Sequence, residues 1–333
     1  MKQRGFRYCS TCQTKLQKWS KTAAGTQRWR CPKCAKTHTR KRVDLSRALL
    51  LERFVKWLLG KQAQVELGLS DRTWRDQTTW CWEIVPKPVL TGEVYVIILL
   101  DGINIGSLVN LIARTPQAVI NWHWAGWESS YTWEELLKQL PTPIVVVCDG
   151  QKGVLLAIAR CWPKARVQRC IFHVWQNIRT KLSLHPQTEA GVELLELTRE
   201  LLRGIPTNEG ALAWQQKLTD WEKCYGGLVR ERTNVVKPRP GQRKWWYTHG
   251  RLRSAYKQLE KLLRDNQLFT YLDTTLTDQP IPRMTNYLEG GINSQIRTRL
   301  KNHRGLNQIH AQRLTDWYLY GRTKDQKPTR KCL

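Results

Sequence analysis

Two Asp-Gly pairs in the sequence each follow a run of apolar residues. Asp101-Gly102 follows Tyr95-Val-Ile-Ile-Leu-Leu100, and Asp149-Gly150 follows Ile144-Val-Val-Val-Cys148. Apolar runs of this length predict buried strands, so both carboxylates are expected at the same edge of one sheet. Carboxylate oxygens are the ligands that Mg²⁺ or Mn²⁺ prefers. Either aspartate alone also fits a different role, as a helix cap or as a turn residue beside its glycine.

Four cysteines near the N-terminus form two matched pairs. Cys9-Ser-Thr-Cys12 is followed, after 18 residues, by Cys31-Pro-Lys-Cys34. This spacing is typical of a zinc ribbon, in which four thiolates hold one structural Zn²⁺ in a tetrahedron. The metal then supplies the folding energy that such short strands lack. Free structural cysteines and a redox role for the C-x-x-C pairs are the alternatives.

The charge of the chain indicates a polyanionic partner. The 333 residues carry a net charge of +28, and residues 1–42 hold 13 Lys or Arg and no acidic residue. Residues 229–264 and 297–333 are also basic, which favours nucleic acid as the partner. The longest apolar run, Val94–Leu100, is far too short to span a membrane, and no apolar signal-peptide core is present. We therefore expect a cytoplasmic, nucleoid-associated protein without membrane contact, whose cysteines are thiols or metal ligands.

A helix-turn-helix is predicted after the cysteine-rich segment. Apolar residues recur at helical spacing over 49–58, and Gly68 precedes Ser70 at the start of a second helix. Serine is a favoured N-cap, and a glycine in a tight turn between helices is typical of this motif. A plain helical hairpin is the alternative. The residues predicted to contact DNA from the second helix are Ser70, Arg72, Thr73 and Arg75.

The elements expected around the two aspartates follow the order βββαβαβα, which is that of an RNase H-like core. After the strand that ends at Asp101 we expect strands at 107–113 and 117–124 and a helix at 133–139. After the strand that ends at Asp149 we expect a helix at 152–161, a strand at 165–171 and a further helix. A long helical stretch, broken at Gly226-Gly227 and at the Pro238/Pro240 loop, is expected over 189–275.

Three blocks of the sequence resemble the mutator-like (MULE-type) DDE transposase superfamily and its bacterial insertion-sequence members. They are Asp149-Gly-Gln-Lys-Gly153 followed by a helix, Cys170-Ile-Phe-His173, and Thr285-Asn-Tyr-Leu-Glu289-Gly-Gly-Ile-Asn293-Ser-Gln-Ile-Arg297. The resemblance covers about residues 91–180 and 283–315. An N-terminal zinc ribbon with a helix-turn-helix also occurs in transposases of this kind. The match at Asp101 is less specific, because it consists only of a predicted strand followed by Asp-Gly.

The resemblance implies a catalytic site of three carboxylates. Asp101, Asp149 and Glu289 would bind two Mg²⁺ or Mn²⁺ ions per active site, with Cys170 and His173 as accessory active-site residues. Two such ions, about 3.5–4 Å apart, can stabilise both the attacking and the leaving oxygen of a phosphodiester. Glu289 lies next to the apolar stripe of Leu288, Ile292 and Ile296, which predicts a helix with one buried face. Arg297 and Arg304 are the expected DNA contacts of this last segment.

Together these expectations describe an α/β protein in five segments. They are a zinc ribbon at 1–42, a helix-turn-helix at 43–90, the first part of an RNase H-like core at 91–180, an all-helical insertion at 181–282, and the C-terminal helices of the core with a basic tail at 283–333.

The expected function is that of a DNA transposase. It would bind the terminal inverted repeats of an insertion sequence and carry out metal-dependent hydrolysis and strand transfer. Its partners would be the double-stranded DNA of transposon ends and target, on which it would act as a homodimer or higher oligomer. A catalytically silent DNA-binding regulator derived from a transposase, and an RNase H-like structure-specific nuclease, are the alternatives.

Overall fold

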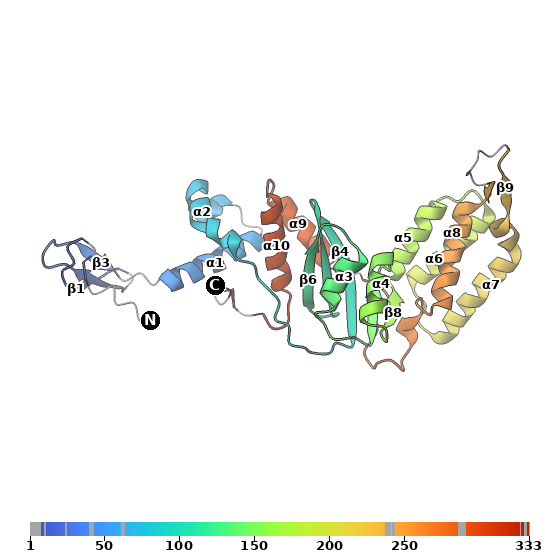
Figure 1. Ribbon diagram of the computed structural model, residues 1–333, viewed down its shortest axis with the longest axis horizontal. Helices are drawn as coiled ribbons and strands as arrows, with labels where there is room; N and C mark the ends of the chain where they lie inside the picture. The colour runs from blue at the N-terminus through green and yellow to red at the C-terminus, as the bar shows by residue number, and fades with distance from the viewer. Residues whose placement is uncertain are drawn as a thin grey trace. The chain divides into compact units, whose positions relative to one another are not determined.

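The computed structural model (Figure 1) describes most of the chain. The chain divides into two compact units, one formed by Met1–Ile84 with Lys327–Leu333 and the other by Val85–Gln326. Among the described residues, no helix is both long and apolar enough to cross a lipid bilayer. The described residues are 8–9, 11–23, 25–39, 43–60, 64–236, 241, 244–285, 291–326, 328–329 and 332.

The first unit begins with a small antiparallel sheet. Its three strands lie in the order β1-β2-β3, and β2 pairs with both neighbours. Cys9, Leu16 and Cys31 form its small buried cluster, so the sheet has almost no apolar core of its own. The strands are β1 (Gln17–Lys21), β2 (Gln27–Arg30) and β3 (Thr37–Thr39).

Two helices separated by a short turn complete the first unit. The side chain of Ser70 caps α2, because its Oγ accepts a hydrogen bond of 3.2 Å from the Thr73 amide. Gly68 in the preceding turn has φ +68°, a conformation that favours glycine. Trp74 is buried and lies edge-on to Trp57, with 5.7 Å between the rings. The predicted N-cap at Ser70 is thus confirmed. The elements are α1 (Val43–Leu59), the 3₁₀ turn η2 (Gln64–Leu67), α2 (Asp71–Thr78) and the 3₁₀ turn η3 (Thr79–Glu83).

A five-stranded mixed sheet organises the second unit. The strand order is β6-β5-β4-β7-β8, with β4, β5 and β6 antiparallel and with β7 and β8 parallel to β4. The order βββαβαβα expected from the sequence is confirmed. The elements are β4 (Ile97–Ile105), β5 (Leu108–Arg114), β6 (Val119–Ala125), α3 (Ser130–Leu137), β7 (Val145–Cys148), α4 (Lys152–Cys161), β8 (Arg166–Arg169) and α5 (Ile171–Leu182).

The first strand of this sheet is longer than predicted. It does not end at Asp101 but continues to Ile105, pairing Ile103 with Asn110 and Ile105 with Leu108 of β5. Ile103 and Ile105 are buried, so the polar Asp-Gly pair interrupts a strand whose apolar alternation resumes beyond it. Asp101 therefore lies within a paired strand, where the sheet fixes its backbone.

Helices cover both faces of the sheet (Figure 1). Helices α3 and α4 pack on one face through a cluster that includes Leu111, Trp133 and Trp162. Helix α10 contacts β4 and β6. There the indole groups of Trp122 and Trp124 both donate to the buried Asp316 carboxylate, at 2.9 and 2.7 Å. The last helices are α9 (Ser294–Asn302) and α10 (Gln308–Tyr320).

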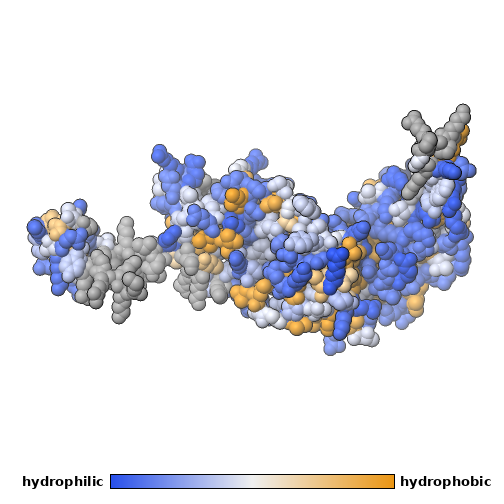
Figure 2. Space-filling view, in the orientation of Figure 1, coloured by the Kyte–Doolittle hydropathy of each residue, from blue (hydrophilic) through white to orange (hydrophobic). Residues whose placement is uncertain are grey.

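Helices α5 to α8 form a bundle with its own apolar core, and hydrophilic residues cover most of its visible surface (Figure 2). After the bundle the chain returns beside β8. There the Arg169 amide donates to the Gln267 carbonyl at 2.8 Å, and Thr270 Oγ1 donates to the Val167 carbonyl at 2.9 Å. The edge of the sheet is thereby covered. The elements are α6 (Glu189–Arg203), α7 (Asn208–Arg230), β9 (Arg232–Asn234), β10 (Trp245–Tyr247), α8 (Gly250–Arg264) and the 3₁₀ turn η4 (Thr270–Leu272).

Two sequence predictions for this stretch are wrong. Gly226-Gly227 does not break the helix, because α7 continues to Arg230. A Cβ on Gly226 would lie 2.6 Å from Arg230 Nη2 and 2.7 Å from Glu222 Oε1, so the glycine makes room for the ion pair between these side chains. The stretch also contains an antiparallel hairpin, β9–β10, which the helical pattern did not indicate.

Candidate functional site

The two aspartates predicted as metal ligands lie side by side. Strands β4 and β7 are parallel neighbours, and Leu100 is paired with Cys148. The residues that follow, Asp101 and Asp149, are therefore at the same level of the sheet, on strands about 4.8 Å apart. Both line a cleft of about 340 Å³. Other residues that line it are Glu128, His173, Asn293 and Arg297.

Hydrogen bonds hold the carboxylate of Asp101. The side chain is 7% exposed, and its Oδ1 accepts a bond of 3.0 Å from the Gly102 amide. Its Oδ2 accepts a bond of 2.9 Å from Nδ2 of Asn293, which is 192 positions away in the sequence. Asn293 belongs to a π-helical turn at 291–293 that leads into α9. The last segment of the core is thus attached directly to the first predicted ligand.

The backbone of Asp149 is held by a buried arginine. Arg169 donates to the Asp149 carbonyl from Nε at 3.1 Å and from Nη2 at 2.6 Å. Gly150 has φ +73°, and a Cβ on it would lie 1.7 Å from Arg169 Nε. The glycine of this Asp-Gly pair is therefore required both by the turn and by the guanidinium. Oδ1 of Asp149 accepts a bond of 3.0 Å from the Gln151 amide.

Glu289 lies outside the described residues, which omit 286–290. The chain on both sides of this gap is held beside the cleft. On one side, the amide and the hydroxyl of Thr285 each donate to Cys170 Sγ at 3.3 Å. On the other side, Asn293 donates to Asp101.

Cys170 and His173 have different positions, although they belong to one motif. Cys170 is fully buried at the start of α5, and the cleft lining includes His173 but not Cys170. Burial raises the pKa of the Cys170 thiol, but the hydrogen bond and charge of His173, together with the bonds from Thr285, outweigh it and lower the pKa overall.

Arg304 is the last of the residues predicted to contact DNA. It is exposed in the turn after α9 and does not line the cleft.

Sequence reasoning missed a third carboxylate in the cleft, that of Glu128. It precedes α3, and Trp133 Nε1 donates to its Oε1 at 2.9 Å. Burial, and then the nearby charge of Asp149, raise the pKa of Glu128 against the opposing effect of the Trp133 bond. Only one feature of the sequence could have indicated Glu128 as a site residue. It stands directly before Ser129, the N-cap of the helix that follows the third strand of the sheet.

The four cysteines of the first unit converge on one point. The Sγ atoms of Cys9, Cys12, Cys31 and Cys34 all lie within 4.8 Å of one another. Cys9 and Cys34 are 3.5 Å apart, and Cys12 and Cys31 are 3.3 Å apart. A tetrahedron with Zn–S bonds of about 2.3 Å has sulfur–sulfur edges of about 3.8 Å. Within the described part of the chain, no other group of His, Cys, Asp or Glu side chains converges in this way.

The two cysteine pairs share one backbone geometry. In each, the residue after the second cysteine donates to the carbonyl of the first, from Gln13 to Cys9 at 2.9 Å and from Ala35 to Cys31 at 3.0 Å. Gln13 and Ala35 both have positive φ, 54° and 58°. Two identical turns therefore present the four sulfur atoms.

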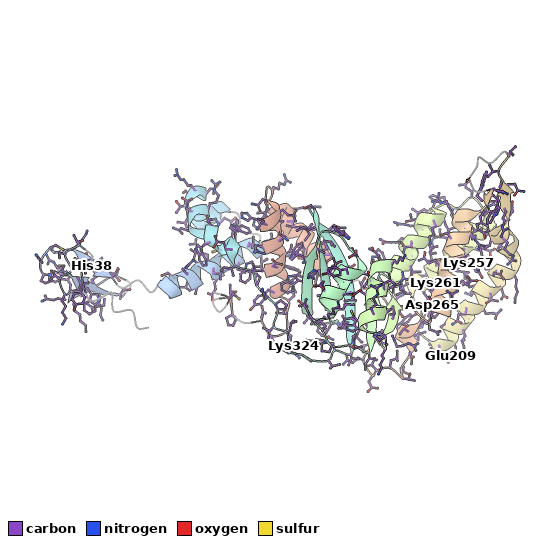
Figure 3. All side chains as sticks on the ribbon, viewed as in Figure 1. His38, Glu209, Lys257, Lys261, Asp265 and Lys324 are labelled. Carbon is purple, nitrogen blue, oxygen red and sulfur yellow. The ribbon has the colours of Figure 1, made fainter. Side chains whose placement is uncertain are left out.

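Electrostatics within the cluster favour a bound cation. Hydrogen bonds from the Thr11 and Cys12 amides outweigh burial and, with the side chain of His38 (Figure 3), lower the pKa of Cys9 to about 5. The Lys36 amide favours the Cys34 thiolate, but the neighbouring cysteines raise the pKa of Cys34 to about 11. Sulfur atoms this close therefore carry four negative charges only with a cation between them.

The residues predicted to read DNA lie on the solvent-facing side of α2. Ser70, Arg72, Thr73 and Arg75 are all exposed, whereas Trp74 between them is buried. The Arg72 side chain is 91% exposed and lies 4.0 Å from Asp76, an ion pair that contributes little in water. This face of α2 thus presents two arginines with few internal contacts.

The β9–β10 hairpin presents a second basic surface. The guanidinium of Arg232 lies 4.0 Å from the Trp245 ring, and that of Arg253 lies 3.8 Å from the Tyr247 ring. Trp246, on the opposite face of the strand, is 52% exposed. Lys261 adds positive charge further along α8 (Figure 3), whereas Lys257 is paired with Glu260 at 2.7 Å.

Two comparisons with known proteins each match part of the chain. Residues 112–234 match the family model described as "Transposase, Mutator family". The chain is also 24% identical over 158 residues to the transposase for insertion sequence element IS905 of Lactococcus lactis subsp. lactis (strain IL1403). This match covers 42% of the chain, and it spans only 39% of the relative's length. Both matches confirm the resemblance to the mutator-like transposases of bacterial insertion sequences that the Asp149 and Cys170-Ile-Phe-His173 blocks predict.

Proposed function

We propose that this protein is a DDE-type DNA transposase that acts through an RNase H-like core. It binds the terminal inverted repeats of its insertion sequence, hydrolyses a phosphodiester and transfers the strand to target DNA. The observation that carries the proposal is the cleft in which the paired strands place Asp101 beside Asp149. The segment that contains Glu289 is held at both ends beside this cleft, by Thr285 and by Asn293.

The side chains of the cleft suit a hard divalent cation. Asp101 and Asp149 supply carboxylate oxygens, and the 3% exposed side chain of Asn293 has an Oδ1 with no hydrogen-bond partner among the described residues. Such a buried oxygen is costly unless a cation or its water satisfies it. Asp101, Asp149 and Glu289 would hold two Mg²⁺ or Mn²⁺ ions, which activate the attacking oxygen and stabilise the leaving one.

Other residues of the site position the ligands and the DNA. Asn293 keeps the Asp101 carboxylate turned toward α9, and Arg169 fixes the turn that carries Asp149. Arg297 is exposed at the cleft and binds a phosphate of the DNA strand, while His173 forms hydrogen bonds beside it. Cys170 acts from outside the cleft, because its bonds to Thr285 place the chain that leads to Glu289.

The remaining parts of the chain bind DNA. The four cysteines hold one structural Zn²⁺, and the basic ribbon around them contacts phosphates. Arg72 and Arg75 on α2 read base edges of the transposon end. The α5–α8 bundle with its hairpin is an insertion in the core that adds a further basic surface. The protein acts on DNA as a homodimer or higher oligomer.

The test is an in vitro reaction on DNA that contains the coding sequence with its genomic flanks. We expect purified protein with Mg²⁺ to cut at the inverted repeats and to join these ends to a target plasmid. Sequencing of the joined products maps both events. Binding to the repeats without any cutting would favour a silent regulator, and cutting at DNA junctions irrespective of sequence would favour a structure-specific nuclease.

A further inference from the structure

The loop between β6 and α3 brings Glu128 into the cleft that holds Asp101 and Asp149. Trp133 Nε1 donates to Oε1 of this glutamate at 2.9 Å. Its second oxygen, Oε2, lies against β4, since a Cβ on Gly102 would be only 3.3 Å from it. One oxygen is thus fixed by the indole of α3, and the other is directed to the residue next to Asp101.

The backbone around Glu128 reaches this position because of a glycine in α4. A Cβ on Gly153 would lie 3.1 Å from the carbonyl carbon of Ser129 and 3.2 Å from the amide nitrogen of Ser130. Both are backbone atoms, which cannot move aside as the end of a flexible side chain can. The first turn of α4 and the start of α3 therefore approach each other more closely than a side chain at residue 153 would normally allow. This close contact brings Glu128 to the end of β7, where Asp149 lies.

The start of α3 is also fixed from within. Ser129 and Thr132 form a reciprocal capping box, in which the Ser129 side chain accepts from the Thr132 amide and Thr132 Oγ1 accepts from the Ser129 amide. Such a box stabilises the first turn of a helix. Glu128 is therefore held by the helix cap, by an indole and by contact with α4, as expected for a side chain whose position matters for binding.

Three carboxylates in one cleft repel one another unless a cation lies between them. The polar groups that face them are Gln151, which hydrogen-bonds Glu128, and Gln176, His173 and Arg297. Asn293 also faces them, and its buried Oδ1 has no hydrogen-bond partner among the described residues. An unpartnered oxygen beside several carboxylates is the arrangement that a hard cation satisfies. Two ions about 3.5–4 Å apart also need more ligands than two aspartates can provide.

We propose that Glu128 is a further ligand of the divalent-cation site on which the proposed function rests, and that it binds the cation together with Asp101 and Asp149. The side-chain oxygens of these three residues do not converge as closely as the four cysteine sulfur atoms do, so binding of the cation draws them together.

The experiment measures Mn²⁺ binding to the zinc-loaded full chain in the absence of DNA, by electron paramagnetic resonance of the free ion. We expect Glu128→Gln to weaken binding at least about tenfold, as loss of a charged ligand should, and Glu128→Asp to recover part of it. Glu135→Gln is the matched control, because it removes the same charge from α3 outside the cleft lining.

The glutamine at 128 keeps an oxygen for the Trp133 indole, so a purely structural role of Glu128 predicts unchanged Mn²⁺ affinity. That result, with binding still weakened by Asp101→Asn and Asp149→Asn, would overturn the role of Glu128 alone. If neither aspartate variant weakened binding, the cation site of the proposed function would itself be wrong. A further measurement needs no variant. Fe²⁺ bound in place of Mn²⁺, with added hydrogen peroxide as oxidant and ascorbate to regenerate Fe²⁺, should form hydroxyl radicals that cleave the wild-type chain near residues 101, 128 and 149. Cleavage near 101 and 149 but not near 128 would also contradict the proposal.

Discussion

The cysteine cluster takes its ligands from two short turns. The cleft that holds Asp101 and Asp149 takes its side chains from β4, the loop before α3, the end of β7, the helix α5, and the turn before α9 with α9 itself. In the cluster, the sulfur atoms approach to 3.3 and 3.5 Å, and the surrounding sheet buries only a few apolar side chains. In the cleft, the aspartates stand on strands that are buried on both faces.

The two sites therefore differ in what keeps them in shape. The cluster has little else to hold it, so we expect its metal to be part of its folding energy. The cleft is shaped by the sheet and by hydrogen bonds such as those from Asn293 to Asp101 and from Arg169 to the Asp149 carbonyl. We expect it to persist without an ion, and its metal to contribute to activity more than to stability.

The largest effect that this comparison predicts is the unfolding of the ribbon when its metal is lost. Cys31→Ser removes one of four zinc ligands and should abolish most of the metal's contribution, which is about 10 kcal/mol or more for small zinc-dependent units. Native mass spectrometry should show the loss of one Zn²⁺. Amide hydrogen exchange should show loss of protection over 8–39, with the unit Val85–Gln326 unchanged.

Cys224→Ser is the matched control, since Cys224 is an exposed free cysteine on α7. It should keep both the zinc and the ribbon. Removal of the metal by a chelator should reproduce the Cys31→Ser result. A ribbon that stayed protected without metal would remove the contrast between the two sites.

Asp149→Asn tests the cleft, where the metal is expected to contribute to activity more than to stability. Loss of this charged ligand of the ions should lower the rate of strand cleavage roughly 10³-fold, which corresponds to several kcal/mol of lost transition-state stabilisation. The melting temperature and the affinity for DNA should change little, because the basic surfaces and the Arg169 contact to the backbone carbonyl remain. Asp101→Asn should act in the same way. Asp220→Asn, an exposed position on α7, is the control. Cleavage near the wild-type rate would exclude Asp149 from the site.

The same contrast explains what the sequence could predict. The cysteine cluster is local, so the spacing of four residues indicated both the ligands and their convergence. The two aspartates were found because each follows an apolar run in the sequence, and the order of the strands then places them together. Glu128 follows no such pattern, because it enters the cleft through a contact between α3 and α4 that no spacing encodes.

Other features depended on long-range contacts in the same way. Asn293 belongs to a block already recognised as part of the site, but its bond to Asp101 joins residues 192 positions apart. Gly226-Gly227 suggested a break because glycine lowers helix propensity. The packing of α7 and the ion pair between Glu222 and Arg230 overcome that preference. The β9–β10 hairpin was missed because its strands are only three residues long each.

Gly153→Ala is predicted to disturb the cleft through the contact between α3 and α4. The added methyl group would lie 3.1 Å from Ser129 and 3.2 Å from Ser130 backbone atoms, so the start of α3 must move by a few tenths of an ångström. We expect a loss of about 1–2 kcal/mol in the free energy of unfolding, as for mild overpacking, and a lower rate of strand cleavage. Denaturant unfolding and the cleavage assay measure the two effects.

Gly227→Ala is the control, and its expected change in the free energy of unfolding has the opposite sign. It lies within α7, and a Cβ there would meet no atom within 4 Å. Replacing a helical glycine by alanine should therefore stabilise the protein by about 0.5–1 kcal/mol, and cleavage should be unchanged. Equal stability changes in the two variants would mean that the contact at Gly153 does not shape the cleft.

The smallest predicted effect concerns the discrimination between DNA sequences in the first unit. Arg75→Ala should reduce the preference for the transposon end over random DNA by about 1 kcal/mol, the lower limit for loss of one contact to a base edge. Affinity for random DNA should fall less, because the basic ribbon keeps its contacts to phosphates. Competition binding at two salt concentrations separates base contacts from phosphate contacts, since loss of a phosphate contact changes the salt dependence of binding and loss of a base contact does not. Lys56→Ala, in the last turn of α1, is the control for a lost charge and should leave the preference unchanged. If Arg75→Ala lowered binding to both DNAs equally, α2 would contact only the backbone, and the β9–β10 hairpin would be the next surface to test for sequence recognition.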